Sequence, residues 1–189
     1  RLEEHKLAPK ILATVNELLE RKGLLLRAGT VVDASLIAAP SSTKNQGGQR
    51  DPEMKQSKKG QQWYFGMKAH IGVDAESGLV HTVRGTSGAV NDVVEANALL
   101  HGQESEAIGD AGYQGADKRP DAKSGVRWHV AMRPGKRKLL DKTQPLGRLM
   151  DEFEKLKASI RAKVEHPFRV VKRQFGHVKV RYRGLAKNT

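Results

Sequence analysis

Glu165 lies in the most basic stretch of the chain, and Arg161, Arg169 and Lys172 flank it at helical spacings. Residues three, four or seven apart share one face of a helix, so this face would present one carboxylate among three cations. Two interpretations remain open for such a carboxylate. It forms ordinary surface ion pairs, each worth about 0.3–0.5 kcal/mol. Alternatively, it is a ligand for a metal ion beside a polyanion whose phosphates the cations hold.

Pro167 favours the second interpretation. A proline inside a helix removes a hydrogen bond and costs roughly 3 kcal/mol, yet the apolar pattern continues past it, which indicates a local requirement for a kink. The pattern predicts one long helix laid against a core. Its apolar positions are Leu149, Phe153, Leu156, Ile160, Val164, Phe168, Val171 and Phe175.

Two further carboxylates lie where strands are expected. Asp33 interrupts the apolar run Thr30–Ala39, which predicts a buried central strand. An unpaired acid there costs several kcal/mol, so Asp33 requires a cation, a metal or solvent nearby. Asp110 follows a short strand that begins at Glu106, on a turn rich in glycine. Such an acid is well placed for chemistry, although a simple Asx turn also explains it.

The elements expected between these acids predict an α/β fold. Asp33 and Asp110 would come from adjacent strands, and Glu165 from a helix packed across them. Three converging carboxylates repel one another unless divalent cations bridge them, and hard oxygen ligands suit Mg²⁺ or Mn²⁺. The other expected elements are a helix over 9–21, an antiparallel hairpin over 63–74 and 79–86, a short helix from 91 or 92 to 100, an outer strand over 126–132 and a basic loop over 133–142.

The segment 40–60 is polar, lacks periodicity and is long for a structureless connection, so we expect a functional or mobile loop. Its five basic residues suit a polyanion, although a solvated linker explains them equally well. These residues are Lys44, Arg50, Lys55, Lys58 and Lys59.

The composition narrows the class of protein. The chain has 189 residues, of which 38% are hydrophobic and none is cysteine, so it can form one full core without disulfides or thiol chemistry. Neither a signal-peptide pattern nor an apolar run of the roughly 18 residues needed to span a bilayer is present, which predicts a soluble intracellular protein.

The charge is unevenly distributed along the chain. The formal net charge is +13; residues 118–189 contain 21 Lys and Arg against 6 Asp and Glu, whereas residues 1–117 contain 13 against 15. A basic half of this kind favours nucleic acid as the partner over a membrane.

Six blocks of the sequence, in order, resemble the DDE transposases of bacterial insertion sequences, specifically the insertion-sequence-five family. The resemblance covers nearly the whole chain and is more specific than any single motif. The blocks are Val31–Ser35, Ala39–Asn45, Gln49–Met54, Gly66–Asp74, Asp110–Gly115 and Arg161–Gly176.

The resemblance implies a ribonuclease H-like fold, a mixed sheet flanked by helices, and a catalytic triad of Asp33, Asp110 and Glu165 that binds Mg²⁺ or Mn²⁺. It implies DNA strand cleavage and strand transfer, with transposon ends and target DNA as partners. The related signature of tyrosine, arginine, glutamate and lysine maps onto Ala158, Arg161, Glu165 and Lys172, so its tyrosine is absent here. The expected DNA-binding residues are Arg161, Arg169, Lys172, Arg173, Lys58 and Lys59.

The resemblance also divides the chain into residues 1–23, the remnant of a preceding region, and residues 24–189, the catalytic core. A truncated copy is expected on this basis, acting in the cytoplasm at the nucleoid, with a homodimer as a candidate assembly. Two alternatives keep the DNA partner: a structure-selective nuclease of the same fold, and a non-catalytic DNA-binding remnant.

Overall fold

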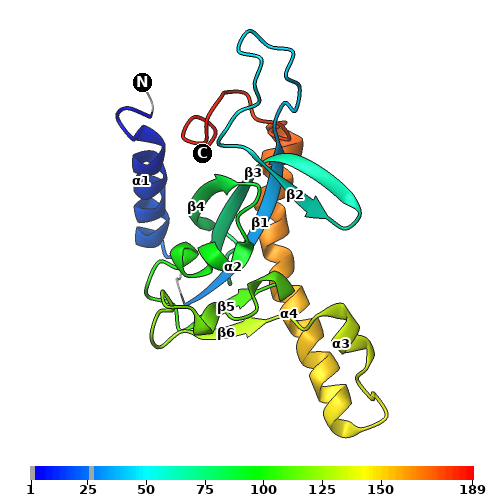
Figure 1. Ribbon diagram of the computed structural model, residues 1–189. Helices are drawn as coiled ribbons and strands as arrows, with labels where there is room; N and C mark the ends of the chain where they lie inside the picture. The colour runs from blue at the N-terminus through cyan, green and yellow to red at the C-terminus, as the bar shows by residue number, and fades with distance from the viewer. Residues whose placement is uncertain (1–2, 26–27) are drawn as a thin grey trace.

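The computed structural model describes residues 3–25 and 28–189. Within these ranges six strands form one mixed sheet with helices on both faces, as predicted (Figure 1). The strand order is β2-β3-β1-β5-β6, and β4 pairs with β3 beside that path. The elements are α1 (Leu7–Arg21), β1 (Gly29–Ala38), β2 (Lys55–Lys59), β3 (Gln62–Asp74), β4 (Val80–Ser87), α2 (Asp92–Glu95), η1 (Ala96–Leu99), β5 (Glu106–Gly109), η2 (Ala111–Tyr113), η3 (Ala116–Lys118), β6 (Arg127–Val130), α3 (Pro134–Lys138), α4 (Pro145–Arg169) and the π-turn η4 (Val170–Gln174).

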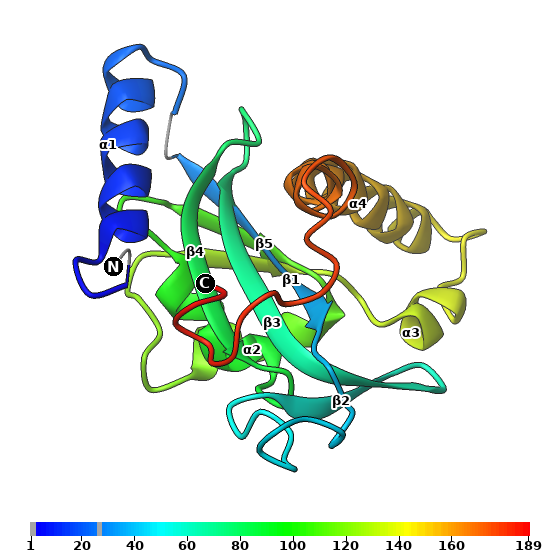
Figure 2. The same ribbon diagram turned by 90° about the horizontal axis from the view of Figure 1, so that it is seen from above.

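Strand β1 is central and covered on both faces (Figure 2). Val31 packs with Val164 of α4, whereas Val32 faces the opposite side and packs with Tyr113. Successive side chains of a strand alternate between its faces, so a strand covered on both sides needs apolar residues at nearly every position. This explains the apolar run Thr30–Ala39 and confirms the predicted buried strand.

The C-terminal segment returns to the far end of β1. The Ala38 N–H donates to the carbonyl of Val178 at 3.1 Å, and the Val180 N–H donates back to the carbonyl of Ala38 at 2.8 Å. Val180 also packs into an apolar cluster with Ile37 and Met54. The segment after α4 is therefore attached to both β1 and the chain leading into β2.

The prediction of a structureless segment over 40–60 is wrong at its C-terminal end. Lys55–Lys59 form β2, which pairs antiparallel with β3 from Gly66 to Gln62, and Gly60 turns the chain with a φ of 62°. The strand is polar and largely exposed, so its sequence shows no apolar alternation. The extended conformation of β2 is therefore set by its hydrogen bonds to β3 and not by a local sequence pattern.

The predicted basic loop over 133–142 contains the short helix α3, and Asp151 of α4 explains its position. Arg137 donates to the Asp151 carboxylate at 2.9 Å, and Lys142 and Lys155 lie 3.3 and 3.2 Å from the other oxygen. Ion pairs with Asp151 thus hold the α3 segment in place, although its local sequence indicated only a loop.

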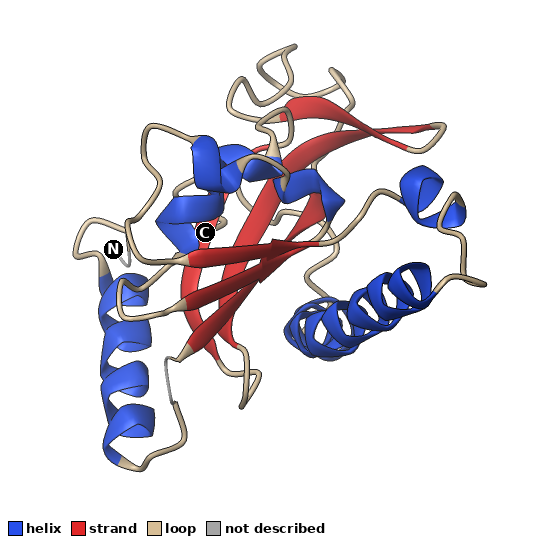
Figure 3. Cartoon of the chain, turned by 90° about the horizontal axis from the view of Figure 1, so that it is seen from below, coloured by secondary structure: helices blue, strands red, loops and turns tan. Residues whose placement is uncertain are grey.

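The predicted apolar stripe describes only the second half of α4. Val164 is buried against the sheet, but Leu149, Phe153 and Leu156 are 62%, 46% and 55% exposed. The first half of α4 extends past the sheet together with α3 (Figure 3), and its buried positions other than Gly147 are charged. Lys157, for example, donates to the carbonyl of Val130 at 2.9 Å. The helix pattern was correct in period but wrong about which face is buried there.

Pro167 does not end the helix. α4 continues to Arg169, and the backbone widens into η4 directly afterwards. π-turns of this kind accommodate local irregularity in a helix without breaking it.

We expect Asp151→Asn to lower the melting temperature by a few degrees at neutral pH, because the hydrogen bond from Arg137 lowers the pKa of Asp151 to about 2. A lowered folded-state pKa stabilises the protein above the unfolded value near 4, and this contribution is lost as the pH falls through about 2. Thermal melts of both proteins across that range measure it. A constant difference down to pH 2 would contradict the assignment.

Candidate active site

Asp33 and Asp110 lie at matching positions on neighbouring parallel strands. Val31 of β1 is opposite Ile108 of β5, and each acid follows its strand residue by two positions. β5 ends directly before Asp110, at the kind of strand end where ligands gather in α/β folds, whereas β1 continues past Asp33 to Ala38. The strand pairing therefore brings together two acids that are 77 positions apart in the sequence.

These acids border a pocket of about 480 Å³ between the sheet and α4. Four carboxylates and four cationic side chains line it, so it is strongly polar but not uniformly of one sign. Its charged residues are Asp33, Asp92, Asp110, Glu165, Lys58, Lys59, Lys68 and Arg161. The structure thus brings the three predicted acids to one pocket.

Asp33 has the most perturbed carboxyl group in the pocket. Its pKa is raised to about 6, first by burial and then by the nearby negative charges of Asp110 and Asp92. The Ala34 N–H, which donates to the carboxylate at 2.8 Å, and the guanidinium of Arg161 oppose that rise in pKa. The ionised form of Asp33 therefore lacks sufficient positive charge around it.

Asp110 caps the short helix η2, where its carboxylate accepts from the Gly112 N–H at 2.7 Å. A β-carbon on Gly112 would lie 2.9 Å from that carboxylate oxygen, so a side chain at this position would require the carboxylate to shift. The Asx turn considered from the sequence is present. The turn holds the Asp110 carboxylate in the pocket, so the Asx-turn interpretation does not exclude a role in chemistry.

Glu165 is exposed on α4, one turn after Arg161. Within the described residues it forms no ion pair with Arg161 or Arg169, so the ordinary surface pairs considered above are not formed. The Nε atom of Arg161 is buried without a hydrogen-bond partner. A buried, unsatisfied cationic donor is costly unless an anion reaches it, and the pocket beside it is open for one.

The other predicted DNA-binding residues fall into two groups. Lys58 and Lys59 line the pocket, and Lys172 lies nearby, donating to the carbonyl of Leu36 at 2.9 Å. Burial, followed by the charge of Lys59, lowers the pKa of Lys172. Arg169 and Arg173 are exposed and do not line the pocket.

Sequence reasoning missed Lys68 and Asp92. Lys68 Nζ lies 2.9 Å from an Asp92 carboxylate oxygen and 2.8 Å from the carbonyl of Val90. The sequence alone predicts Asp92 only at the start of a short helix, and Lys68 only within a strand of the hairpin. The strand register, which places Lys68 opposite Leu36 of β1, was the missing information.

The donor set of the pocket suits a hard divalent cation, because carboxylate oxygens are the ligands that Mg²⁺ and Mn²⁺ prefer. Burial first, and then the neighbouring acids, raise the pKa of Asp33, and a bound cation would offset both effects. In the described residues, however, no three Asp, Glu or His side chains are close enough to hold an ion in this conformation. The acids share a pocket, and ion binding would require their side chains to adjust.

A mixed sheet with one acid within its central strand, a second directly after the neighbouring parallel strand and a third on the covering helix defines the class of ribonuclease H-like domains. The chain matches the family model of the transposase DDE domain over residues 25–189, and it therefore belongs to that family. The match begins after α1. No solved structure matches the chain.

Membership of this family implies DNA as the partner and a transposase-like function. In the part of the chain that the structure describes, no helix combines the length and apolar character needed to cross a bilayer.

We expect Asp33→Asn to raise the melting temperature in chelator at about pH 8. The folded-state pKa of about 6 exceeds the unfolded value of 3.8, so Asp33 favours folding most below about pH 4, and that contribution is lost as the pH rises through 6. Melts at about pH 8 and pH 4 measure the difference, which should disappear at the lower pH. A destabilised variant at about pH 8 would contradict the unfavourable burial of the ionised carboxylate inferred here.

Proposed function

We propose that this chain is a transposase of the insertion-sequence-five family that cuts the ends of its element and joins them to target DNA. Asp33, Asp110 and Glu165 are its catalytic carboxylates. The observation that carries the proposal is the pairing of β1 with β5, which places two acids side by side in a pocket that Glu165 and Arg161 also border. This combination of acids and cations suits phosphoryl transfer on a polyanion.

Asp33, Asp110 and Glu165 would hold Mg²⁺ or Mn²⁺. Divalent ions held there would activate a water or a DNA 3′-hydroxyl as the nucleophile and would neutralise the charge that develops on the leaving oxygen. Asp33 would then be ionised at neutral pH, because a cation lowers the pKa of a carboxyl group that burial and neighbouring acids had raised.

The cations of the pocket position the DNA backbone. Arg161 would donate its unsatisfied Nε–H to a phosphate oxygen beside the reacting group, since Arg161 and Glu165 border the same pocket. Lys58 and Lys59 would hold adjacent phosphates from the opposite rim. Lys68 keeps Asp92 neutralised, so that Asp92 does not add a further unpaired charge beside Asp33.

The direct test uses labelled DNA that carries the terminal repeats flanking the gene, together with a target plasmid and Mg²⁺ or Mn²⁺. We expect Asp33→Asn, Asp110→Asn and Glu165→Gln each to reduce cleavage by at least about a thousandfold. Glu152→Gln, an exposed acid on the same helix outside the pocket, serves as the matched control and should retain activity.

Asp33→Cys adds a sharper test of metal ligation. A thiolate binds Mn²⁺ better than Mg²⁺, so we expect Mn²⁺ to restore cleavage selectively in this variant. Cleavage without joining would identify a structure-selective nuclease instead. DNA binding with neither cleavage nor joining in any metal would identify a non-catalytic DNA-binding domain.

Substitution of Arg161 tests phosphate binding separately from metal binding. We expect Arg161→Ala to reduce cleavage by roughly a hundredfold, and Arg161→Lys to recover only part of it, because lysine lacks the planar donor fork. Mn²⁺ affinity, measured by electron paramagnetic resonance, should remain within about twofold of the parent protein. A large loss of Mn²⁺ affinity would show that Arg161 instead supports the carboxylates.

A further inference from the structure

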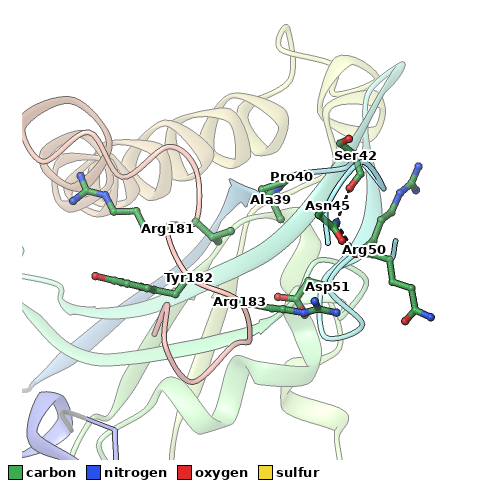
Figure 4. Close-up of a pocket in the computed structure, with 11 residues that line it drawn as sticks. Ala39, Pro40, Ser42, Asn45, Arg50, Asp51, Arg181, Tyr182 and Arg183 are labelled. Carbon is green, nitrogen blue, oxygen red and sulfur yellow. Dashed lines mark hydrogen bonds between the residues drawn. The ribbon is translucent and has the colours of Figure 1, made fainter. Parts of the chain in front are cut away.

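A second pocket, of about 300 Å³, lies at the far end of β1 from Asp33. It is formed where the loop after β1 meets the segment after η4, two parts of the chain that are more than 120 positions apart in the sequence. Three arginines line it: Arg50 from the loop, and Arg181 and Arg183 from the C-terminal segment (Figure 4).

The two acids at this junction, Asp51 and Glu53, accept hydrogen bonds from backbone N–H groups. Asp51 accepts from the Gly184 N–H at 2.6 Å and from the Glu53 N–H at 3.0 Å, and Glu53 accepts from the Leu185 N–H. These bonds fasten the C-terminal segment to the loop. Among the described residues, none of the three arginines of the pocket forms an ion pair with a carboxylate. Arg50 donates to the carbonyl of Ser41 at 2.7 Å and Arg181 to the carbonyl of Phe175 at 3.4 Å, so these side chains are held by neutral partners and their charges are not neutralised by an acid.

The arrangement of the arginines indicates an extended ligand. Arg181 and Arg50 extend towards opposite sides of the pocket, and Arg183 lies between them beside Asp51 (Figure 4). A single phosphate ion would need donors that converge on one point. A row of cations instead matches successive phosphates along one strand.

Tyr182 favours nucleic acid over an acidic protein segment. It lies between Arg181 and Arg183 in the sequence, borders the same pocket and is 62% exposed. An exposed aromatic ring interleaved with cations can stack on an unpaired base while its neighbours hold phosphates. An acidic peptide has no group that would use the ring in this way.

The second pocket is also linked to the first along β1. Ala39, which borders the second pocket, lies six positions after Asp33, and at about 3.3 Å per residue this is roughly 20 Å. That distance corresponds to about six base pairs of DNA at 3.4 Å each. Leu36, whose carbonyl accepts from Lys172, lies between Asp33 and Ala39 along β1 and still lines the first pocket.

From these observations we propose that the second pocket binds the backbone of a DNA strand beyond the position of cleavage. Arg50, Arg181 and Arg183 contact its phosphates, and Tyr182 stacks on an unpaired base. This inference rests on the proposed function for its ligand, but its test requires no catalysis.

The test measures the affinity of the full chain for a mixed-sequence duplex with a single-stranded tail, by fluorescence anisotropy without divalent metal and at several salt concentrations. Each phosphate contact contributes about 0.7–0.9 to the slope of log affinity against log salt. Replacing Arg50, Arg181 and Arg183 by alanine together should lower that slope by about two and weaken binding at least tenfold. Replacing all three by lysine should restore most of the slope.

The matched control removes three exposed cations elsewhere, Lys10, Lys22 and Arg148, and should change the slope by less than about one. Tyr182→Ala should weaken binding of the tailed duplex several-fold but leave blunt duplex binding unchanged. Circular dichroism melts verify that each variant is folded.

Three outcomes would overturn the inference: equal slopes for the pocket and control variants, equal loss of tailed and blunt duplex binding in Tyr182→Ala, or loss of polyglutamate binding with DNA binding intact. The last would assign the pocket to an acidic protein partner. Asp33→Asn should retain the full salt slope, so a failure of the catalytic proposal is distinguishable from a failure of this one.

Discussion

The desolvated carboxylate of Asp33 is the constraint on which the site depends. Strand β1 must be apolar because helices cover both of its faces, and Asp33 interrupts that apolar run in the middle of the sheet. Burial and the neighbouring acids raise its pKa to about 6, so the fold tolerates this charge at a cost in stability. A cost of this kind is expected at a functional position, where a bound cation recovers it.

The cations around the pocket neutralise its acids only in part. Lys68 forms an ion pair with Asp92, and Lys172 donates a hydrogen bond to the backbone of β1, whereas the Arg161 Nε lacks a hydrogen-bond partner. Arg161 and the exposed lysines of β2 are therefore the cations of the pocket that can still bind an anion. This incomplete compensation suits a site that receives both metal ions and phosphates.

The long helix α4 combines two environments. Its second half packs apolar side chains such as Val164 against the sheet and carries Glu165 to the pocket. Its first half leaves the sheet, exposes Leu149 and Phe153, and buries Asp151 among cations. One helix thus serves as core, as part of the site and as a projecting arm, because the sheet beneath it is shorter than the helix.

The sequence by itself determined the mixed α/β class and the buried strand β1, because apolar periodicity and local blocks of residues carry that information directly. It also indicated Asp33, Asp110 and Glu165, and the structure brings them to one pocket. Only the tertiary structure decided the strand β2, the helix α3, the buried face of the first half of α4, and the presence of Asp92 and Lys68 beside the acids. Each of these depends on a partner distant in sequence, such as the edge of β3 or the carboxylate of Asp151, and a local pattern does not encode such partners.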